Sequence, residues 1–306
     1  MHPAPSIIVF TTMSGLGYGL AVVLGLGLLD PALAATKVAH VVALTLIAGG
    51  LLSSTLHLGN PQRAWRALSQ WRTSWLSREG VLAILTFIPL CMNAYAAIFQ
   101  SRHLLISGFL GAVGAVATVY CTAMIYGSLK SVQAWNTPLT PICYLLFAGA
   151  GGGLLGLLVA IIGGNGVLFL TLVSLVFLIA SWTVKFYWRR NMQTLQPLST
   201  PESATGLGDI GRVKLFQSPH GNENYLTREM GFRVARKHAR KLAAISLILG
   251  GVVPAVLTVA ILTAGAQTYA LAIILAVAAL VSHVIGVLAE RWLFFAEAKH
   301  AVMNYY

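Results

Sequence analysis

Residues 141–162 read PICYLLFAGAGGGLLGLLVAII. This run carries no charged side chain, and a helix of that length crosses the hydrocarbon core of a bilayer. Eight such runs occur in the chain, over residues 5–29, 37–57, 80–99, 104–129, 141–162, 166–187, 242–264 and 268–292. The sequence therefore predicts an all-α polytopic membrane protein, a bundle of eight transmembrane helices that forms a single membrane domain over residues 1–306.

The overall composition agrees with this interpretation. The chain has 306 residues, of which 57% are hydrophobic and only 9% charged, whereas about a quarter of the residues of a soluble protein are charged. A large soluble enzyme is excluded. The net charge of +12 would suggest nucleic acid for a soluble protein, but here the charges belong to membrane topology and no nucleic-acid partner is expected. The three cysteines form no CxxC pair, so we expect no disulfide, zinc site or iron–sulfur cluster within the chain.

The distribution of basic residues predicts the orientation. Of the 20 lysines and arginines, 18 fall on one side of the eight spans, and Lys37 and Arg102 fall on the other. Cytoplasmic segments carry the excess of basic residues, so we expect both termini and the loops 58–79 and 188–241 to be cytoplasmic. The connections on the opposite side are short, and partner proteins should therefore dock from the cytoplasm.

Few ionisable groups are predicted near the middle of the membrane. All eight carboxylates lie in loops or at the ends of the runs, whereas ion-coupled transporters usually place one near the midplane. A small-molecule or anion transporter is therefore the less favoured alternative. His283 lies within the last run and has two interpretations, a functional group or a hydrogen-bonded contact between helices. A haem-b quinone anchor, with one haem between His57 and His283, is a further alternative.

The most informative stretch is SSTLHLGNPQRAWRALSQWRTSWLSREG, residues 53–80. A predicted span ends at His57, and Gly, Asn and Pro break the helix directly after it. On a helical wheel three tryptophans and a leucine share one face, with Arg63 and Arg66 opposite. This pattern predicts a helix that lies along the membrane surface, although an aromatic belt flanked by arginines explains the same composition.

His57 and Glu79 form a pair of titratable groups at the predicted boundary of the hydrocarbon core. Oxidation of a quinol releases two protons, and each needs an acceptor within hydrogen-bond reach. Histidine suits this chemistry because its ordinary pKa of about 6.5 is close to neutral pH. The stretch therefore predicts a quinone site made from His57 and Glu79, together with Arg63, Arg66 and Arg78.

Four segments resemble a known family. They are HPAPSIIVFTTMSGLGYGL, the stretch 53–80 quoted above, YCTAMIYGSLKSVQAWNTPLTP and LFQSPHGNENYLTREMGFRVARKHARKL, which begin at residues 2, 53, 120 and 215. Together they are similar to the membrane anchor subunits of the dimethyl sulfoxide reductase family, over nearly the whole chain.

The resemblance implies a haem-free, non-catalytic subunit in a bacterial inner membrane. Such a subunit exchanges electrons between a quinone (menaquinone or ubiquinone) and an iron–sulfur subunit. The iron–sulfur clusters and the molybdopterin would then lie only in partner subunits, the latter in the catalytic one. The family implicates a histidine ending the second span and an acidic residue opening the third in quinol binding, which correspond to His57 and Glu79. The predicted cytoplasmic docking side resembles sulfite:quinone oxidoreductases, so sulfite is favoured over dimethyl sulfoxide, another S- or N-oxide, or formate.

The segment 215–242 is a candidate docking surface. Its basic residues recur at helical spacing and form one stripe, made by Arg233, Arg236, Lys237, Arg240 and Lys241. Anionic lipid alone would explain such a stripe. The preceding residues combine donors, acceptors and an aromatic ring, as protein interfaces do. We therefore expect this loop and the segment 58–79 to form the platform for the iron–sulfur subunit.

Overall fold

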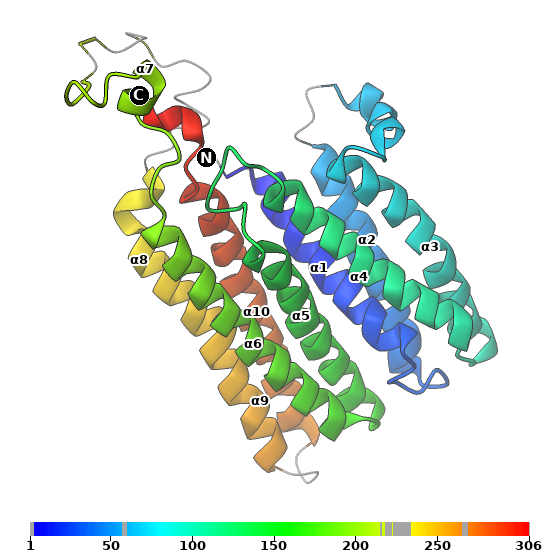
Figure 1. Cartoon of the computed structure of the whole chain (residues 1–306). Coiled ribbons are helices and arrows are strands. Elements are labelled where there is room, and N and C mark those ends of the chain that lie inside the picture. The colour runs from blue at the N-terminus through cyan, green and yellow to red at the C-terminus, as the bar shows by residue number, and fades with distance from the viewer. Residues whose placement is uncertain are drawn as a thin grey trace.

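The structure is a computed structural model of the whole chain, and it describes residues 3–56, 60–214, 216–217, 222, 234–264 and 269–305. In this part of the chain every regular element is a helix (Figure 1). The elements are α1 (Pro5–Gly25), α2 (Ala34–Thr55), the 3-10 helix η1 (Pro61–Gln70), α3 (Trp75–Gln100), α4 (Leu105–Gly127), α5 (Leu139–Gly163), α6 (Val167–Thr194), α7 (Pro201–Thr205), α8 (Val234–Leu247), the π-helix η3 (Ile248–Val252), α9 (Val253–Ala264), α10 (Tyr269–Ala296) and η4 (Ala301–Asn304).

In the described part of the chain, eight helices are long and apolar enough to cross a membrane, which confirms the predicted class. The seventh is continuous through α8, η3 and α9. Four helices extend well beyond the predicted runs at their polar ends: α3 begins at Trp75, α6 continues to Thr194, α8 begins at Val234 and α10 continues to Ala296. Parts of the predicted loops 58–79 and 188–241 are therefore helical.

Helix α1 lies at the centre of the bundle, where it packs against α2, α4, α5 and α10. Its approach to α5 is close, since a Cβ atom built on Gly19 would lie 1.9 Å from the carbonyl oxygen of Ala148. Small residues allow this closeness in membrane helices. Figure 1 shows α2, α3 and α4 on one side of this central contact and α6, α9 and α10 on the other. The two halves therefore meet along α1 and α5.

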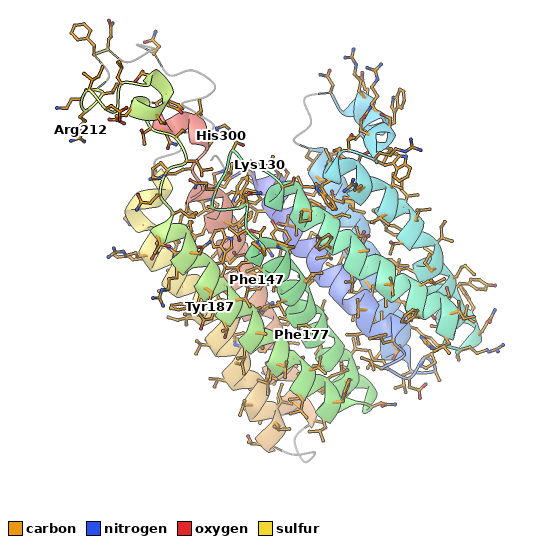
Figure 2. All side chains as sticks on the ribbon, in the orientation of Figure 1. Lys130, Phe147, Phe177, Tyr187, Arg212 and His300 are labelled. Carbon is orange, nitrogen blue, oxygen red and sulfur yellow. The ribbon has the colours of Figure 1, made fainter. Side chains whose placement is uncertain are left out.

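The termini, η1, α7 and η4 lie at one end of the bundle, which we call the polar end (Figure 1). Lys130, Arg212 and His300 lie at this end, whereas Phe177 lies within the bundle (Figure 2). At the opposite end Lys37, at the start of α2, donates a hydrogen bond to Ser101 at 2.8 Å. The same end of the molecule thus holds both termini and the described parts of the basic loops. Their cytoplasmic location stays a prediction.

Candidate functional site

Glu79 lies at the start of the second turn of α3, with its side chain inside the bundle. Ser74 fixes the beginning of this helix by accepting a hydrogen bond from the N–H of Ser77 at 3.4 Å. Only 4% of Glu79 is exposed, and a buried carboxylate needs a hydrogen-bond donor. Thr122 of α4 supplies it, with its Oγ1 only 2.5 Å from Glu79 Oε1.

The position of Thr122 suits both charge states of Glu79. Its Oγ1 also lies 3.0 Å from the carbonyl oxygen of Thr118, and a hydroxyl group has one proton to donate. An ionised Glu79 accepts that proton. A protonated Glu79 instead donates to Thr122, which then donates to Thr118. Neither state leaves either of these two side chains without a partner, so the site can gain or lose a proton without a rearrangement of the helices.

Threonine hydroxyls continue from Glu79 along the interface of α3 and α4. The hydroxyl oxygens of Thr86 and Thr118 lie 3.4 Å apart, and Thr118 also donates to the carbonyl of Gly114 at 2.8 Å. Both threonines are buried. The interface between α3 and α4 therefore contains a row of buried hydroxyl groups that begins at Glu79.

Arg78 joins η1 to α3. Its Nε donates to the carbonyl of Trp71 at 3.0 Å and its Nη2 to the carbonyl of Arg72 at 2.6 Å. Its guanidinium group also lies 4.3 Å from the ring centre of Trp75, within the range of a cation–π interaction. This side chain therefore stabilises the turn between the two helices, a structural role that the sequence did not indicate.

Arg63 and Arg66 lie on η1, where both are exposed. The structure forms a helix where a surface helix was predicted, but it is a 3-10 helix, and its Trp65 is 66% exposed. Leu68, on the same helix, is close enough to Gly80 of α3 that a Cβ there would meet it at 2.8 Å. Because Glu79 is buried and the two arginines are exposed, their place in one site with Glu79 stays a prediction.

His57 lies outside the residues that the structure describes. It follows α2, which ends at Thr55, with Leu56 as its C-cap. The predicted pairing of His57 with Glu79 therefore also stays a prediction.

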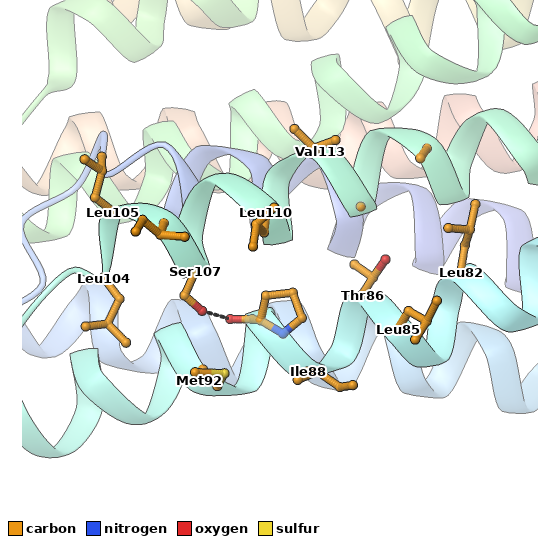
Figure 3. A pocket seen from close by; sticks show the side chains of 14 residues that line it. Leu82, Leu85, Thr86, Ile88, Met92, Leu104, Leu105, Ser107, Leu110 and Val113 are labelled. Carbon is orange, nitrogen blue, oxygen red and sulfur yellow. Dashed lines mark hydrogen bonds between the residues drawn. The ribbon is translucent and has the colours of Figure 1, made fainter.

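A large apolar groove opens between α3 and α4 (Figure 3). Its volume is about 890 Å³, and it extends from Leu82, one turn after Glu79, to Leu105 at the other end of α4. Ser107 crosses the interface in the groove by donating a hydrogen bond to the carbonyl of Pro89 at 2.8 Å. The groove suits a long hydrocarbon chain, and Glu79 itself does not line it.

A second group of charges is buried between α6 and α10. Lys185 Nζ lies 2.6 Å from Glu290 Oε1, and Arg291 Nε lies 3.5 Å from Glu290 Oε2. Glu290 is 2% and Arg291 3% exposed. The sequence places Glu290 at the end of a predicted run and gave no sign that it is buried. The structure adds that Glu290, Lys185 and Arg291 pair inside the bundle.

Aromatic rings surround the two cations of this cluster. Lys185 Nζ lies 3.5 Å from the ring centre of Trp188, and the Arg291 guanidinium lies 3.8 Å from that of Tyr144. Nearer the polar end, Arg189 makes two hydrogen bonds to Glu297, at 2.9 and 2.8 Å. Burial raises the pKa of Glu297, although the nearby Arg189 opposes this effect.

His283 is fully buried in α10 and faces η3. Pro254 has no N–H, so the α-helical hydrogen bond to the carbonyl of Gly250 cannot form. His283 Nδ1 lies 2.7 Å from that carbonyl oxygen and replaces the missing donor. Ser282 similarly donates to the carbonyl of Leu249 at 2.7 Å. Of the two interpretations of His283, this geometry supports the contact between helices.

The structure describes only part of the predicted docking and metal-binding features. Most of segment 215–233, including Arg233, lies outside the described residues, and so do the side chains of Arg236 and Lys237. Within the described residues, no three histidine, cysteine or acidic side chains gather to hold a metal ion. Cys121 and Cys143 are buried, and Cys91 is exposed.

The protein is similar to a family of membrane anchor subunits and to subunits of two oxidoreductases. The model of the DMSO reductase anchor subunit (DmsC) family matches residues 1–296. The protein is 34% identical to a subunit of the sulfite dehydrogenase of Allochromatium vinosum, over 100% of this sequence and 99% of that subunit. It is 27% identical to a subunit of the anaerobic dimethyl sulfoxide reductase of Escherichia coli, over 68% of this sequence and 76% of that subunit. No solved structure matches it significantly. The match over nearly the whole length shows that the protein belongs to the DMSO reductase anchor subunit (DmsC) family.

Proposed function

We propose that this protein anchors an oxidoreductase complex in a bacterial inner membrane and exchanges electrons between the quinone pool and an iron–sulfur subunit. A molybdopterin catalytic subunit completes the proposed complex. The observation that carries the proposal is the position of Glu79, a buried carboxylate with a hydroxyl partner. It lies one turn of α3 before Leu82, the first residue that lines the apolar groove. A quinone has a polar ring and a long isoprenoid tail, so this arrangement offers each part a suitable surface.

Glu79 and Thr122 would manage one proton of the reaction. In quinol oxidation the O–H bond of the bound quinol breaks, and its proton forms a new O–H bond on the Glu79 carboxylate. Thr122 then turns its own proton toward the carbonyl of Thr118, which lies 3.0 Å away. The two electrons leave for the iron–sulfur subunit, and His57 is the proposed acceptor of the second proton. Quinone reduction runs through the same groups in the reverse direction.

Sulfite is the favoured substrate of the proposed catalytic partner. The relative that matches the whole length of the protein is named as a subunit of a sulfite dehydrogenase. The relative named for dimethyl sulfoxide reduction matches less of the sequence, at lower identity. Sulfite oxidation would supply electrons to the quinone pool.

The test replaces Glu79 by glutamine in the assembled complex. We expect quinone-linked turnover to fall about 10–100-fold, because an unpaired polar group at the headgroup costs about 1–3 kcal/mol. Turnover with a soluble artificial electron acceptor should persist, since it bypasses the membrane subunit. His57→Ala should behave in the same way.

The matched control is Glu202→Gln, because Glu202 is a half-buried carboxylate of the short helix α7 at the polar end, outside the membrane-spanning helices. It should leave both activities unchanged. Normal quinone-linked turnover in assembled Glu79→Gln would refute the proposed role. If vesicles that contain only this protein accumulate a small anion, the transporter alternative would be favoured instead.

A further inference from the structure

A small polar cavity lies between α1, α4, α5 and α10. The polar side chains at its wall come from all four helices and include Thr12, Thr122, Tyr144, His283 and Arg291. The space that it leaves for a water molecule is about 20 Å³. That is enough for one water, which needs about 10–15 Å³, and far too little for a quinone ring. The cavity is thus distinct from the groove between α3 and α4.

Thr12 Oγ1 and His283 Nε2 are buried at this cavity and make no hydrogen bond within the described part of the chain. His283 Nδ1 lies 2.7 Å from the carbonyl oxygen of Gly250, which can only accept. In the neutral imidazole Nδ1 therefore carries the proton, and Nε2 is an acceptor in need of a donor. The Thr12 hydroxyl can both donate and accept. A single water molecule would satisfy both atoms.

Arg291 gives such a water a preferred orientation. Arg291 lines the cavity and is positively charged. Its acidic neighbour Glu290 also pairs with Lys185, so one negative charge faces two positive charges. The oxygen of a water molecule would therefore point toward Arg291 and one of its hydrogens toward His283 Nε2. Thr122 of α4 also lines the cavity and is the hydrogen-bond partner of Glu79.

We propose that this cavity binds one structural water, held by Thr12, His283 and Arg291, which reorients when Glu79 changes its charge. The link is Thr122, which lines the same cavity. When Glu79 is protonated, the Thr122 oxygen accepts its proton and has one fewer lone pair to offer the water. No net proton passes through the water, so only hydrogen bonds change. The coupling to Glu79 rests on the proposed quinone reaction, whereas the water site itself does not.

Redox-induced infrared difference spectroscopy of the full complex with bound quinone tests the proposal. The spectra are recorded in ordinary water and in water labelled with oxygen-18. We expect an O–H stretching band that shifts with the label, as an internal water requires. Thr12→Val should remove or displace this band, because valine keeps the shape of threonine but lacks the hydroxyl group. Thr12→Ser should retain the band.

Thr171→Val is the matched control. Thr171 is equally buried, but it lies on α6 away from the cavity and donates to the carbonyl of Val167 at 2.7 Å. Its replacement should leave the labelled band in place. Quinone bands without any label-sensitive water band, or an unchanged band in Thr12→Val, would overturn the proposed coupling.

The proposed function and the water site fail in distinguishable ways. If the quinone bands themselves are missing from the wild-type spectrum, the proposed function fails and the coupling fails with it. The water site is then decided by an experimental density map of the complex. Ordered density between Thr12 and His283 would support it, and a dry cavity at a resolution that shows other internal waters would refute it.

Discussion

At the level of single residues, Glu79 and Glu290 are both buried, but their surroundings differ. Glu290 lies between two cations, at 2.6 Å from Lys185 and 3.5 Å from Arg291. Among the described residues Glu79 makes no ion pair, and its close partner is the hydroxyl of Thr122. A carboxylate held by cations stays ionised, whereas one held by a hydroxyl can exchange its proton. These surroundings suit Glu290 to a structural role, and they are compatible with the proton transfer proposed for Glu79.

The charge balance around Glu290 predicts that replacing Glu290 lowers the stability of the protein more than replacing Lys185. Glu290→Gln would leave Lys185 and Arg291 as two buried cations, at a cost of about 3–5 kcal/mol. Lys185→Met would leave the neutral pair Glu290 and Arg291, so we expect a clearly smaller loss. The measurement is thermal unfolding of the complex in detergent. A dye that becomes fluorescent when it reacts with the buried thiols of Cys121 and Cys143 monitors the unfolding. Equal melting temperatures for the two variants would contradict this account of the cluster.

At the level of whole elements, the pair α3 and α4 combines the polar and apolar parts of the proposed site. Glu79 and Thr122 lie toward the polar end. The groove of about 890 Å³ lies further along the same two helices, from Leu82 onward. The other half of the bundle is joined differently, since α10 makes hydrogen bonds from Ser282 and His283 to carbonyl groups of η3. The first half therefore carries the proposed binding surface, and the second half holds buried charges and polar contacts.

Filling the groove should discriminate between quinones by the length of their tails. Ala117 lines the groove on α4 and is half-buried, so Ala117→Phe would place a ring in it. We expect the KM for a long-tailed quinone to rise several-fold, while that for a short-tailed analogue changes little. Steady-state kinetics with both substrates measures the effect.

Val176→Phe is the control for this prediction, because Val176 is exposed on the outer surface of α6 and does not line the groove. It should leave both KM values unchanged. An equal change for long and short tails in Ala117→Phe would show that the groove does not hold the tail.

At the level of the whole molecule, the even number of crossings places both termini at the polar end, together with η1, α7 and η4. A partner subunit that contacts this end would lie near Glu79 and near the basic loops. The connections at the opposite end are short, as between Gly163 of α5 and Val167 of α6. The architecture therefore offers one end for the assembly of a complex.

Reporter fusions test the orientation of this end. Fusions after Asn136 and Glu202 should report a cytoplasmic location, and a fusion at Gly164 should report the opposite side, because 18 of the 20 basic residues lie on the first side. Asn136 lies between α4 and α5, and Gly164 between α5 and α6. A reversed pattern would place the docking surface outside the cytoplasm and would favour an exported partner enzyme.

The sequence by itself determined the class of the fold, the eight crossings and Glu79 as a candidate residue. Hydropathy is summed locally along the chain, so each span could be recognised without knowledge of its neighbours. Helix ends were less predictable, as α6 shows by continuing through charged residues to Thr194. The charged residues are compatible with a helix because Lys185 and Arg189 form ion pairs with residues of other segments. The last turns of α6 lie at the polar end of the bundle.

Only the tertiary structure decided which polar groups meet. Lys185 and Glu290 come from helices far apart in the chain, and each looks like an ordinary charge near the end of a span until α6 and α10 pack together. Thr122 gave no local signal, because a threonine in a membrane helix usually bonds to its own backbone. Its partner Glu79 lies on another helix. Burial, ion pairing and hydrogen bonding between helices depend on packing, and packing is not written in the local pattern of any single segment.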